Sequence, residues 1–340
     1  NTKDLGMLPG DSNKDLLVSL RSLPGISTVT GRAGDLRIRG GTPDQTLLLY
    51  NNIPIYHKGY YYGTISPFST DIVNEVKVYR SGYTPRLGGR VGGAIEINTD
   101  NDVPAKVSGG IATSSVYASG YLKTPIIKNK VGLSLSARSS HPFEYTSPIE
   151  KEYERMVLAA SQLNARSNID GSSKKPITFD FWDLSGTINY NPSKKDQVLF
   201  NFLSINNENN IFINEGMRQS NTETNATLSN GGLNLQWNRQ WGYWKNSAFI
   251  TTARYDYKVR QQDFSNLNNE RTRLNSQENS LRTIKIGNTL TRKNEHNYRE
   301  FSVGYEATSL MTNLETEVLS LGNPGPEIPT GSSDQLATIH

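Results

Sequence analysis

The fold of this chain is decided by one stretch, Ile72–Thr99, which reads IVNEVKVYRSGYTPRLGGRVGGAIEINT. Its two ends alternate apolar and polar side chains over 75–79 and 94–98, and a period of two predicts short strands. Paired glycines at 88–89 and 92–93 lie between these strands. Glycine has no Cβ, so such pairs let the backbone approach another surface closely, although an ordinary glycine-rich turn is the alternative. Because no G-x-x-x-x-G-K-[ST] pattern is present, a phosphate-binding loop is not indicated.

The residues before this stretch predict a compact region of mixed helix and strand. A helix is expected over 13–23, with leucines on one face, Asp11 or Ser12 as its N-cap, and Pro24 just after its end. The pair Asn51-Asn52 tolerates positive φ angles and predicts a tight turn. Short strands are expected at 36–39, 46–50 and 53–55.

The pattern changes after about residue 105, where long stretches alternate apolar and polar residues. In 131–138, for example, Val, Leu, Leu and Ala alternate with Gly, Ser, Ser and Arg. By itself this alternation also fits a soluble β-sandwich with one face in its core. The nine strands that we expect cover 106–113, 116–124, 131–140, 178–190, 197–206, 232–241, 247–259, 282–292 and 298–311.

The lengths of the expected connections favour a membrane barrel over a sandwich. From the third strand onward, long polar links at 141–177, 207–231 and 260–281 alternate with short ones. Outer-membrane barrels have short periplasmic turns and longer outside loops, whereas compact soluble folds have few long loops. The tail from Thr312 would begin another outside loop. Nine strands cannot close a barrel in lipid without leaving backbone groups unpaired, so we expect an incomplete barrel.

Composition argues against several classes of function. The 340 residues include no Cys and four widely spaced His, so thiolate chemistry, disulfides and His metal clusters are not expected. Lys and Arg (36) slightly outnumber Asp and Glu (32) and are scattered, which gives no nucleic-acid footprint. No Ser-His-Asp arrangement is identifiable, so we expect no enzyme, no catalytic residues and no cofactor.

The stretch Ile72–Thr99 resembles the plug signature of TonB-dependent outer-membrane transporters. In that family a strand ending in Arg-Gly leads to an aromatic-Gly turn, paired glycines and an Ile-Asn-Ile-x-Thr strand into the barrel. Here Ser81 interrupts the Arg-Gly pair, Leu87 stands where Tyr is usual, and Glu96 replaces an Asn or Val. Three earlier segments also occur in family order: LPGI at 23–26, LRIRG at 36–40 and LLYNNIPI at 48–55.

The resemblance implies a mixed α+β plug domain followed by antiparallel transmembrane β-barrel strands. The plug domain would cover residues 1–100, and residues 101–340 would form the N-terminal portion of a barrel of the 22-stranded type, truncated after about nine strands. The protein would lie in the outer membrane of a Gram-negative bacterium, in contact with outer-membrane lipid.

The resemblance also implies TonB-dependent active import of a nutrient ligand. The ligand, a small molecule, a sugar or a peptide, would bind from outside while TonB acts on a segment upstream of the plug. An alternative is an outer-membrane receptor, or a partner of a surface lipoprotein, that uses the same fold for signalling or assembly. A soluble β-rich binding protein is a third hypothesis. Iron chelates, cobalamin, oligosaccharides and peptides all use the family's fold, so the ligand stays open.

Two plug loops face outward in the family and touch the ligand. A Tyr-rich apex offers flat, amphipathic contact area at low entropic cost, although it could instead pack beneath the barrel's outer loops. The expected ligand-binding residues are His57, Lys58, Tyr60, Tyr61 and Tyr62 in the first loop, and Arg86 and Leu87 in the second.

Plug arginines in the family pair with carboxylates of the barrel wall and so lock the plug. Arg39 and Arg80 match those arginine positions. Glu300 and Glu306 lie on the polar face of the last expected strand and are candidate partners, with later strands as the other source. The alternative is that these charges serve only solubility.

Overall fold

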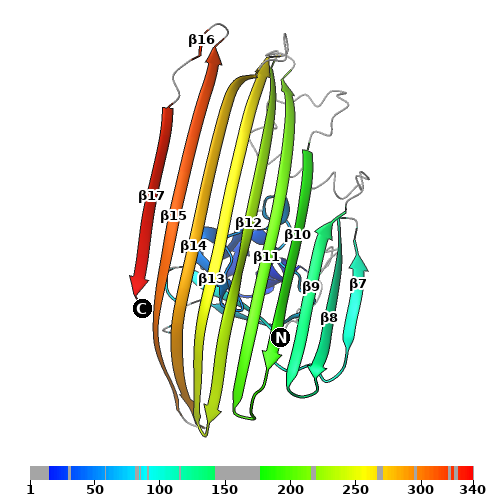
Figure 1. Ribbon diagram of the computed structural model, residues 1–340, viewed down its shortest axis with the longest axis vertical. Helices are drawn as coiled ribbons and strands as arrows, with labels where there is room; N and C mark the ends of the chain where they lie inside the picture. The colour runs from blue at the N-terminus through cyan, green and yellow to red at the C-terminus, as the bar shows by residue number, and fades with distance from the viewer. Residues whose placement is uncertain are drawn as a thin grey trace.

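The computed structural model describes the chain as two units, a small mixed unit and one large sheet (Figure 1). Within the described residues, no helix has the length and apolar character needed to cross a membrane. The residues left out of the description are 1–14, 30–31, 58, 81–83, 85, 90–91, 115, 142–176, 216–219, 266–270, 295–296, 321–322, 325–327 and 340.

The N-terminal unit, called the plug here, combines short helices with two small sheets. Strands β1 and β2 pair antiparallel, and a four-stranded sheet has the order β4-β3-β6-β5, in which β3 and β6 run parallel. This arrangement confirms the mixed α+β class. The elements are α1 Leu16–Ser19, η2 Leu20–Ser22, β1 Ile26–Thr28, η3 Ala33–Asp35, β2 Leu36–Ile38, η4 Pro43–Gln45, β3 Thr46–Tyr50, β4 Ile53–Pro54, α2 Tyr60–Gly63, β5 Val73–Tyr79 and β6 Gly93–Thr99.

The first helix is shorter than expected and has a different N-cap. Asp15 caps α1, because its side chain accepts a hydrogen bond from the Val18 N–H at 3.1 Å. The expected caps, Asp11 and Ser12, lie outside the described residues. The α-helical part ends at Ser19 and continues as the 3₁₀ helix η2, so the helical segment stops before Pro24, as its ring requires.

The turn between β3 and β4 has the geometry that its sequence predicts. Asn51 and Asn52 both have positive φ, 46° and 67°. Asparagine tolerates this region better than most residues, and two consecutive positive φ values match the right-handed twist of a hairpin. The turn brings the Asn51 side chain to Thr99, which donates its N–H to the Asn51 Oδ1 at 3.0 Å.

The large sheet, called the wall here, is antiparallel and follows chain order from β7 to β15. Strands β16 and β17 both pair with β15. The elements are β7 Ser108–Thr113, β8 Tyr117–Ile127, β9 Val131–Ser140, β10 Ile177–Tyr190, β11 Asp196–Glu215, β12 Ser220–Trp241, β13 Trp244–Ser265, β14 Arg271–Lys293, β15 Tyr298–Ser320, β16 Asn323–Pro324 and β17 Ile328–Ile339.

All nine expected wall strands are present as β7 to β15, but five are much longer than the sequence indicated. Strands β11 to β15 have 20 to 23 residues each, so most of the expected links at 207–231 and 260–281 are strand. The segment from Thr312, expected to begin a loop, continues β15. Both faces are polar in these extensions, so apolar alternation disappears although the backbone ladder continues. The expected link at 141–177 lies almost wholly outside the described residues.

The wall is inside out compared with a soluble sheet. On β10 the side chains of Trp182 and Leu184 are 45% and 39% exposed, whereas Ser185 and Thr187 are fully buried. The polar face therefore meets the plug and the apolar face points away from it. A soluble sandwich would bury the apolar face, so this finding argues against that alternative and fits strands that face lipid.

The turns of the wall lie at its two ends (Figure 1). The links β10–β11, β12–β13 and β14–β15 are short and lie together at the short-turn end, while the strand extensions run to the other end. The plug lies against one face of the wall. Its apolar core reaches the wall at Phe179 and Phe181 of β10, which belong to the same buried cluster as Tyr60 and Tyr61 of α2.

Candidate functional site

Buried hydroxyl groups join the plug sheet to β10 of the wall. The Tyr50 hydroxyl on β3 donates to the Ser185 Oγ at 3.1 Å. The Thr99 Oγ1 at the end of β6 lies 2.7 Å from the Thr187 Oγ1, with which it shares a hydrogen bond. All four residues are buried. We call these two buried hydrogen bonds, Tyr50 with Ser185 and Thr99 with Thr187, the polar seam between plug and wall.

A single amide on β12 binds the backbone between β4 and α2. The Asn230 Oδ1 accepts hydrogen bonds from the N–H groups of Tyr56 at 2.7 Å and His57 at 3.2 Å. Its Nδ2 donates to the carbonyl of Pro54 at 3.4 Å and to that of Arg254 at 3.1 Å. Asn230 therefore holds the plug segment to the wall without using any plug side chain.

An ion pair inside the wall extends to the plug. Arg138 on β9 donates from Nε and Nη2 to the Asp183 Oδ2 on β10, at 2.8 and 2.7 Å. Its Nη2 also donates to the Ser66 carbonyl of the plug at 2.7 Å, and the Tyr60 hydroxyl donates to the Asp183 Oδ2 at 3.1 Å. Both charges are buried, so they depend on each other and on these hydrogen bonds.

Aromatic rings surround this ion pair. The Tyr60 ring stacks on Phe181 with centroids 4.0 Å apart, and the Arg138 guanidinium lies 5.4 Å from the Tyr60 centroid and 5.0 Å from that of Tyr117. Cations bind favourably to such ring faces. Burial, followed by the negative charge of Asp183, raises the pKa of Tyr60 well above its ordinary value. Its hydroxyl therefore remains protonated and able to donate.

The start of α1 is connected to the same ion pair through Ser66. The Asp15 carboxylate accepts hydrogen bonds from the Ser66 N–H at 2.7 Å and from its hydroxyl. The Ser66 carbonyl in turn accepts from Arg138. Asp15 thus caps the helix and links it to the residue that contacts the wall.

The expected ligand-binding residues of the first plug loop are mostly buried. His57, Tyr60 and Tyr61 are 3%, 0% and 1% exposed, and Tyr61 packs against Phe179 with centroids 4.6 Å apart. Lys58 lies outside the described residues, and Tyr62 is part of α2. The rings of Tyr60 and Tyr61 contact Phe181 and Phe179 of the wall. Ligand contact at the five expected positions of this loop stays a prediction.

His57 is neutral in this environment. Its Nδ1 accepts a hydrogen bond from the Gly59 N–H at 3.5 Å, and its buried Nε2 has no hydrogen-bond partner among the residues that the structure describes. Burial disfavours the charged imidazolium and lowers the pKa of His57 to about 3.

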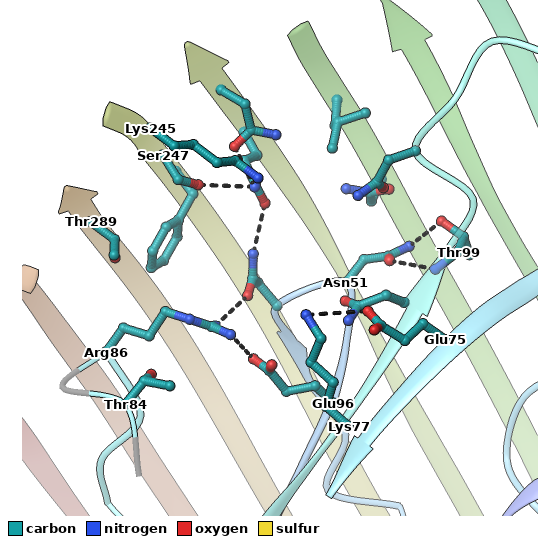
Figure 2. Close-up of a pocket in the computed structure, with 18 of the residues that line it drawn as sticks. Asn51, Glu75, Lys77, Thr84, Arg86, Glu96, Thr99, Lys245, Ser247 and Thr289 are labelled. Carbon is teal, nitrogen blue, oxygen red and sulfur yellow. Dashed lines mark hydrogen bonds and ion pairs between the residues drawn. The ribbon is translucent and has the colours of Figure 1, made fainter. Parts of the chain in front are cut away.

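The second plug loop turns toward the short-turn end of the wall. Arg86 forms an ion pair with the buried Glu96 of β6 and donates to the Asn52 Oδ1 at 3.3 Å (Figure 2). Its carbonyl accepts from the Lys285 Nζ at 3.3 Å. Leu87 is buried. The outward position expected for Arg86 is therefore not observed, because the carboxylate of Glu96 holds its guanidinium between plug and wall.

Arg86 and Glu96 line a cavity of about 380 Å³ between the plug sheet and β11 to β15. Figure 2 shows Lys77 and Glu96 of the plug and Lys245 and Ser247 of the wall around the same space. The wall residues that line it lie close to the short turns.

The four expected locking residues do not meet among the described residues. Arg39 has a positive φ of 52°, and Arg80 donates to the carbonyl of Pro24 within the plug. Glu306 pairs with Lys285 of the neighbouring strand at 3.3 Å, and Glu300 accepts from Tyr298. Glu306 therefore has a cation of the wall as its partner, and Arg80 has a carbonyl of the plug. Locking of Arg39 or Arg80 by later strands stays a prediction.

Sequence reasoning missed the residues that do join the plug to the wall. Arg138 and Asp183 are 45 positions apart, and only the register of β9 with β10 brings them together. Their position on the polar face of alternating strands was the one available signal. Among the described residues, no group of three or more His, Asp or Glu could hold a metal ion.

Comparisons with known proteins agree with this geometry. The model of the TonB-dependent receptor plug domain matches residues 5–95. The outer-membrane transporter YddB from Escherichia coli is similar in structure, with a TM-score of 0.56, 13% identity, and coverage of 99% of this chain and 52% of that one. The ferric yersiniabactin uptake receptor FyuA from Yersinia pestis has a TM-score of 0.52, 12% identity, and coverage of 94% and 58%.

The comparison with curated proteins gave no match. The chain spans little more than half the length of the solved structures that it resembles. Residues 5–95 therefore form a plug domain of the TonB-dependent receptor type. The strands that follow have the antiparallel fold of the barrels in those two solved structures.

Proposed function

We propose that this protein imports a nutrient ligand across the bacterial outer membrane, using energy supplied through TonB. The plug closes the path at rest, and TonB acts on a segment upstream of it. The short-turn end of the wall faces the periplasm and the strand extensions face outward, as in other outer-membrane barrels. The plug domain ends near residue 100, between β6 and β7.

The observation that supports this proposal is the polar seam between plug and wall. Hydrogen bonds such as those of Tyr50 with Ser185 and Thr99 with Thr187 can be exchanged for bonds to water. Each contributes only about 0.5–1.5 kcal/mol net for that reason. An apolar seam would instead cost about 25 cal/mol for every Å² exposed on separation. The polar part of the contact is therefore the part that a moving plug gives up at least cost, whereas the apolar contacts with Phe179 and Phe181 add to the cost of movement.

The buried ion pair fits the same purpose. Arg138 and Asp183 both belong to the wall, so they remain paired when the plug moves. Departure of the plug removes the contacts with the Ser66 carbonyl, the Tyr60 hydroxyl and the Tyr60 ring. If one partner of the ion pair belonged to the plug, plug movement would leave a buried charge unpaired, at a cost of about 3–5 kcal/mol.

A disulfide across the seam tests whether import requires this movement. The chain has no Cys, and the Thr99 and Thr187 hydroxyl oxygens are 2.7 Å apart, so the pair Thr99→Cys and Thr187→Cys is within reach of a disulfide. A strain lacking the gene is first grown on media that each limit one nutrient: an iron chelate, cobalamin, an oligosaccharide or a peptide. The nutrient that no longer supports growth identifies the ligand.

Complementation with the oxidised double variant should then fail to restore growth, and a reductant should restore it. Each single-cysteine variant should behave like the wild type. Full growth with a completely oxidised disulfide would contradict plug movement at this seam. Unchanged growth of the deletion strain on every nutrient would contradict import and favour a receptor that partners a surface lipoprotein.

A further inference from the structure

The cavity beside Arg86 has a lining rich in carboxamides. They come from both units, with Asn52 and Asn98 on the plug and Asn201, Gln236 and Asn238 on the wall. A carboxamide both donates and accepts hydrogen bonds, as does a ligand hydroxyl. The cavity volume of about 380 Å³ lies within the range of about 300–1,000 Å³ that is usual for small-molecule sites.

The charges around the cavity disfavour an anionic ligand. Arg86 pairs with Glu96, and Lys77 pairs with Glu75 at 3.2 Å. The lining contains five acidic and three basic side chains, so its formal charge is negative. A negative lining repels anions. Asn52, Gln236 and Asn238 already hydrogen-bond to one another, and Asn98 and Asn201 offer further amide groups to a neutral partner.

Two lining atoms have no hydrogen-bond partner in the described part of the chain. They are the Thr84 Oγ1 and the Glu300 Oε1, and both atoms are buried. A buried polar atom without a partner is unfavourable and usually indicates a bound water or ligand group. Hydroxyl groups of a ligand could supply both partners, one donating to the Glu300 carboxylate and another bonding to the Thr84 hydroxyl.

Aromatic side chains complete the lining. Tyr79 of β5 and Tyr298 of β15 approach the cavity from its two sides. The Tyr79 hydroxyl donates to the Glu96 Oε2 at 2.9 Å, which fixes the direction of its ring. Ring faces provide flat, amphipathic area beside the hydrogen-bonding groups. Amides, a free carboxylate oxygen and ring faces together fit a compact solute with many hydroxyl groups.

We propose that this cavity binds a neutral, hydroxyl-rich solute with the chemistry of a sugar, held by Thr84, Glu300 and the amides of plug and wall. The cavity lies at the short-turn end, so a bound solute has already passed most of the plug. This place in the path rests on the proposed import function, whereas the binding itself does not.

Binding is tested with the protein as its bacterium expresses it, purified in detergent. Isothermal titration calorimetry is run with neutral disaccharides and trisaccharides of glucose, xylose and mannose, and with citrate as an anionic comparison. We expect at least one neutral saccharide to bind and citrate not to bind. Glu300→Gln should weaken saccharide binding about tenfold, because a hydrogen bond to a charged group is lost. Thr84→Val should weaken it about threefold or more.

Matched control variants come from β15, the strand that contains Glu300. Glu315→Gln and Thr316→Val change the same residue types at exposed positions of β15 that do not line the cavity, and they should leave binding unchanged. Thermal unfolding of each variant checks that the fold is retained.

Three results would overturn the inference: citrate binding as tightly as the saccharides, no saccharide binding at all, or equal affinity of the cavity variants and their controls. None of these outcomes changes the growth and disulfide results, so import could stand without this site. Conversely, saccharide binding with no effect of the disulfide would leave the site and remove the import proposal.

Discussion

The plug and the wall bury opposite kinds of side chain. In the plug, Ile38, Tyr50 and Ile97 are at most 1% exposed. In the wall, Ser185 and Asn234 are fully buried, while the neighbouring Leu184 and Leu235 are 39% and 47% exposed. The plug is built around an apolar core that continues onto Phe181 and Leu203 of the wall. The wall buries mainly polar side chains elsewhere on its plug-facing side and exposes apolar ones on the other, as expected for strands that face lipid.

The two regions therefore depend on different interactions. The plug is stabilised by apolar burial, which is non-directional and proportional to area. The plug-facing side of the wall also buries apolar side chains such as Phe181 and Leu203, but its hydrogen bonds and the ion pair of Arg138 with Asp183 require specific partners. Substitutions that remove one polar partner should therefore lower the stability of the wall strongly.

The largest loss of stability is expected at the buried ion pair of the wall. Arg138→Met leaves the Asp183 charge buried without its cation and should lower the free energy of unfolding by about 3–5 kcal/mol. The double variant Arg138→Met with Asp183→Leu should recover most of this loss, because no charge then remains buried. The measurement is the temperature at which the folded protein loses its anomalous gel mobility in detergent.

Arg254→Met is the matched control for this prediction. Arg254 also pairs with an Asp of the wall, Asp256, but its side chain is 63% exposed. Exposed ion pairs contribute at most about 1 kcal/mol. Equal losses of stability in Arg138→Met and Arg254→Met would show that the buried ion pair is as well solvated as the exposed one.

The plug should lose stability on mild acidification because of His57. Its folded-state pKa of about 3 is below the usual 6.5, so the unfolded state binds the proton more readily. Stability is therefore complete above about pH 6.5 and falls as the pH decreases toward 3. Between pH 7 and pH 5 the loss should be about 2 kcal/mol.

Denaturant midpoints of the wild type and of His57→Phe at these two pH values test the prediction. The variant should lose less stability than the wild type over the same interval. An identical loss in both proteins would assign the pH dependence to other groups.

A smaller effect is expected where the plug meets the ion pair. Tyr60→Phe removes the hydroxyl that donates to the Asp183 Oδ2 but keeps the ring stacked on Phe181. Loss of a hydrogen bond to a charged acceptor should cost about 1.5 kcal/mol. Tyr50→Phe is the control, because it removes a buried hydroxyl that donates to an uncharged acceptor, the Ser185 Oγ, and it should lower the free energy of unfolding by only about 1 kcal/mol. Equal losses of stability in the two variants would show that the charge of Asp183 adds little to the Tyr60 contact.

The sequence predicts the parts of the fold that have a local signal. Alternation locates β9 at Val131–Ser140, and the Asn51-Asn52 pair specifies the turn with two positive φ values. The outer halves of β11 to β15 have no such signal, because most of their side chains on both faces are polar and apolar residues do not alternate with them. Strand ends in that region depend on pairing with neighbours, which a single sequence does not reveal.

The candidate site was harder to predict than the fold. The approach of Arg138 to Asp183 depends on the register of two strands, and that of Ser66 to Arg138 depends on how the plug sits against the wall. The Tyr60-Tyr61-Tyr62 run suggests an exposed apex, yet the rings of Tyr60 and Tyr61 are buried. Aromatic residues with a hydroxyl suit both environments, so composition does not distinguish them.

The tryptophans of the wall allow the most direct test of this comparison. All four Trp of the chain lie in the wall, and Trp182, Trp237 and Trp241 are 41–45% exposed on the side away from the plug. The protein is reconstituted into vesicles of brominated and of ordinary phosphatidylcholine, and tryptophan fluorescence is compared. We expect strong quenching by the brominated chains. Equal fluorescence in the two lipids would mean that the apolar face does not contact lipid, and would contradict the account of the wall.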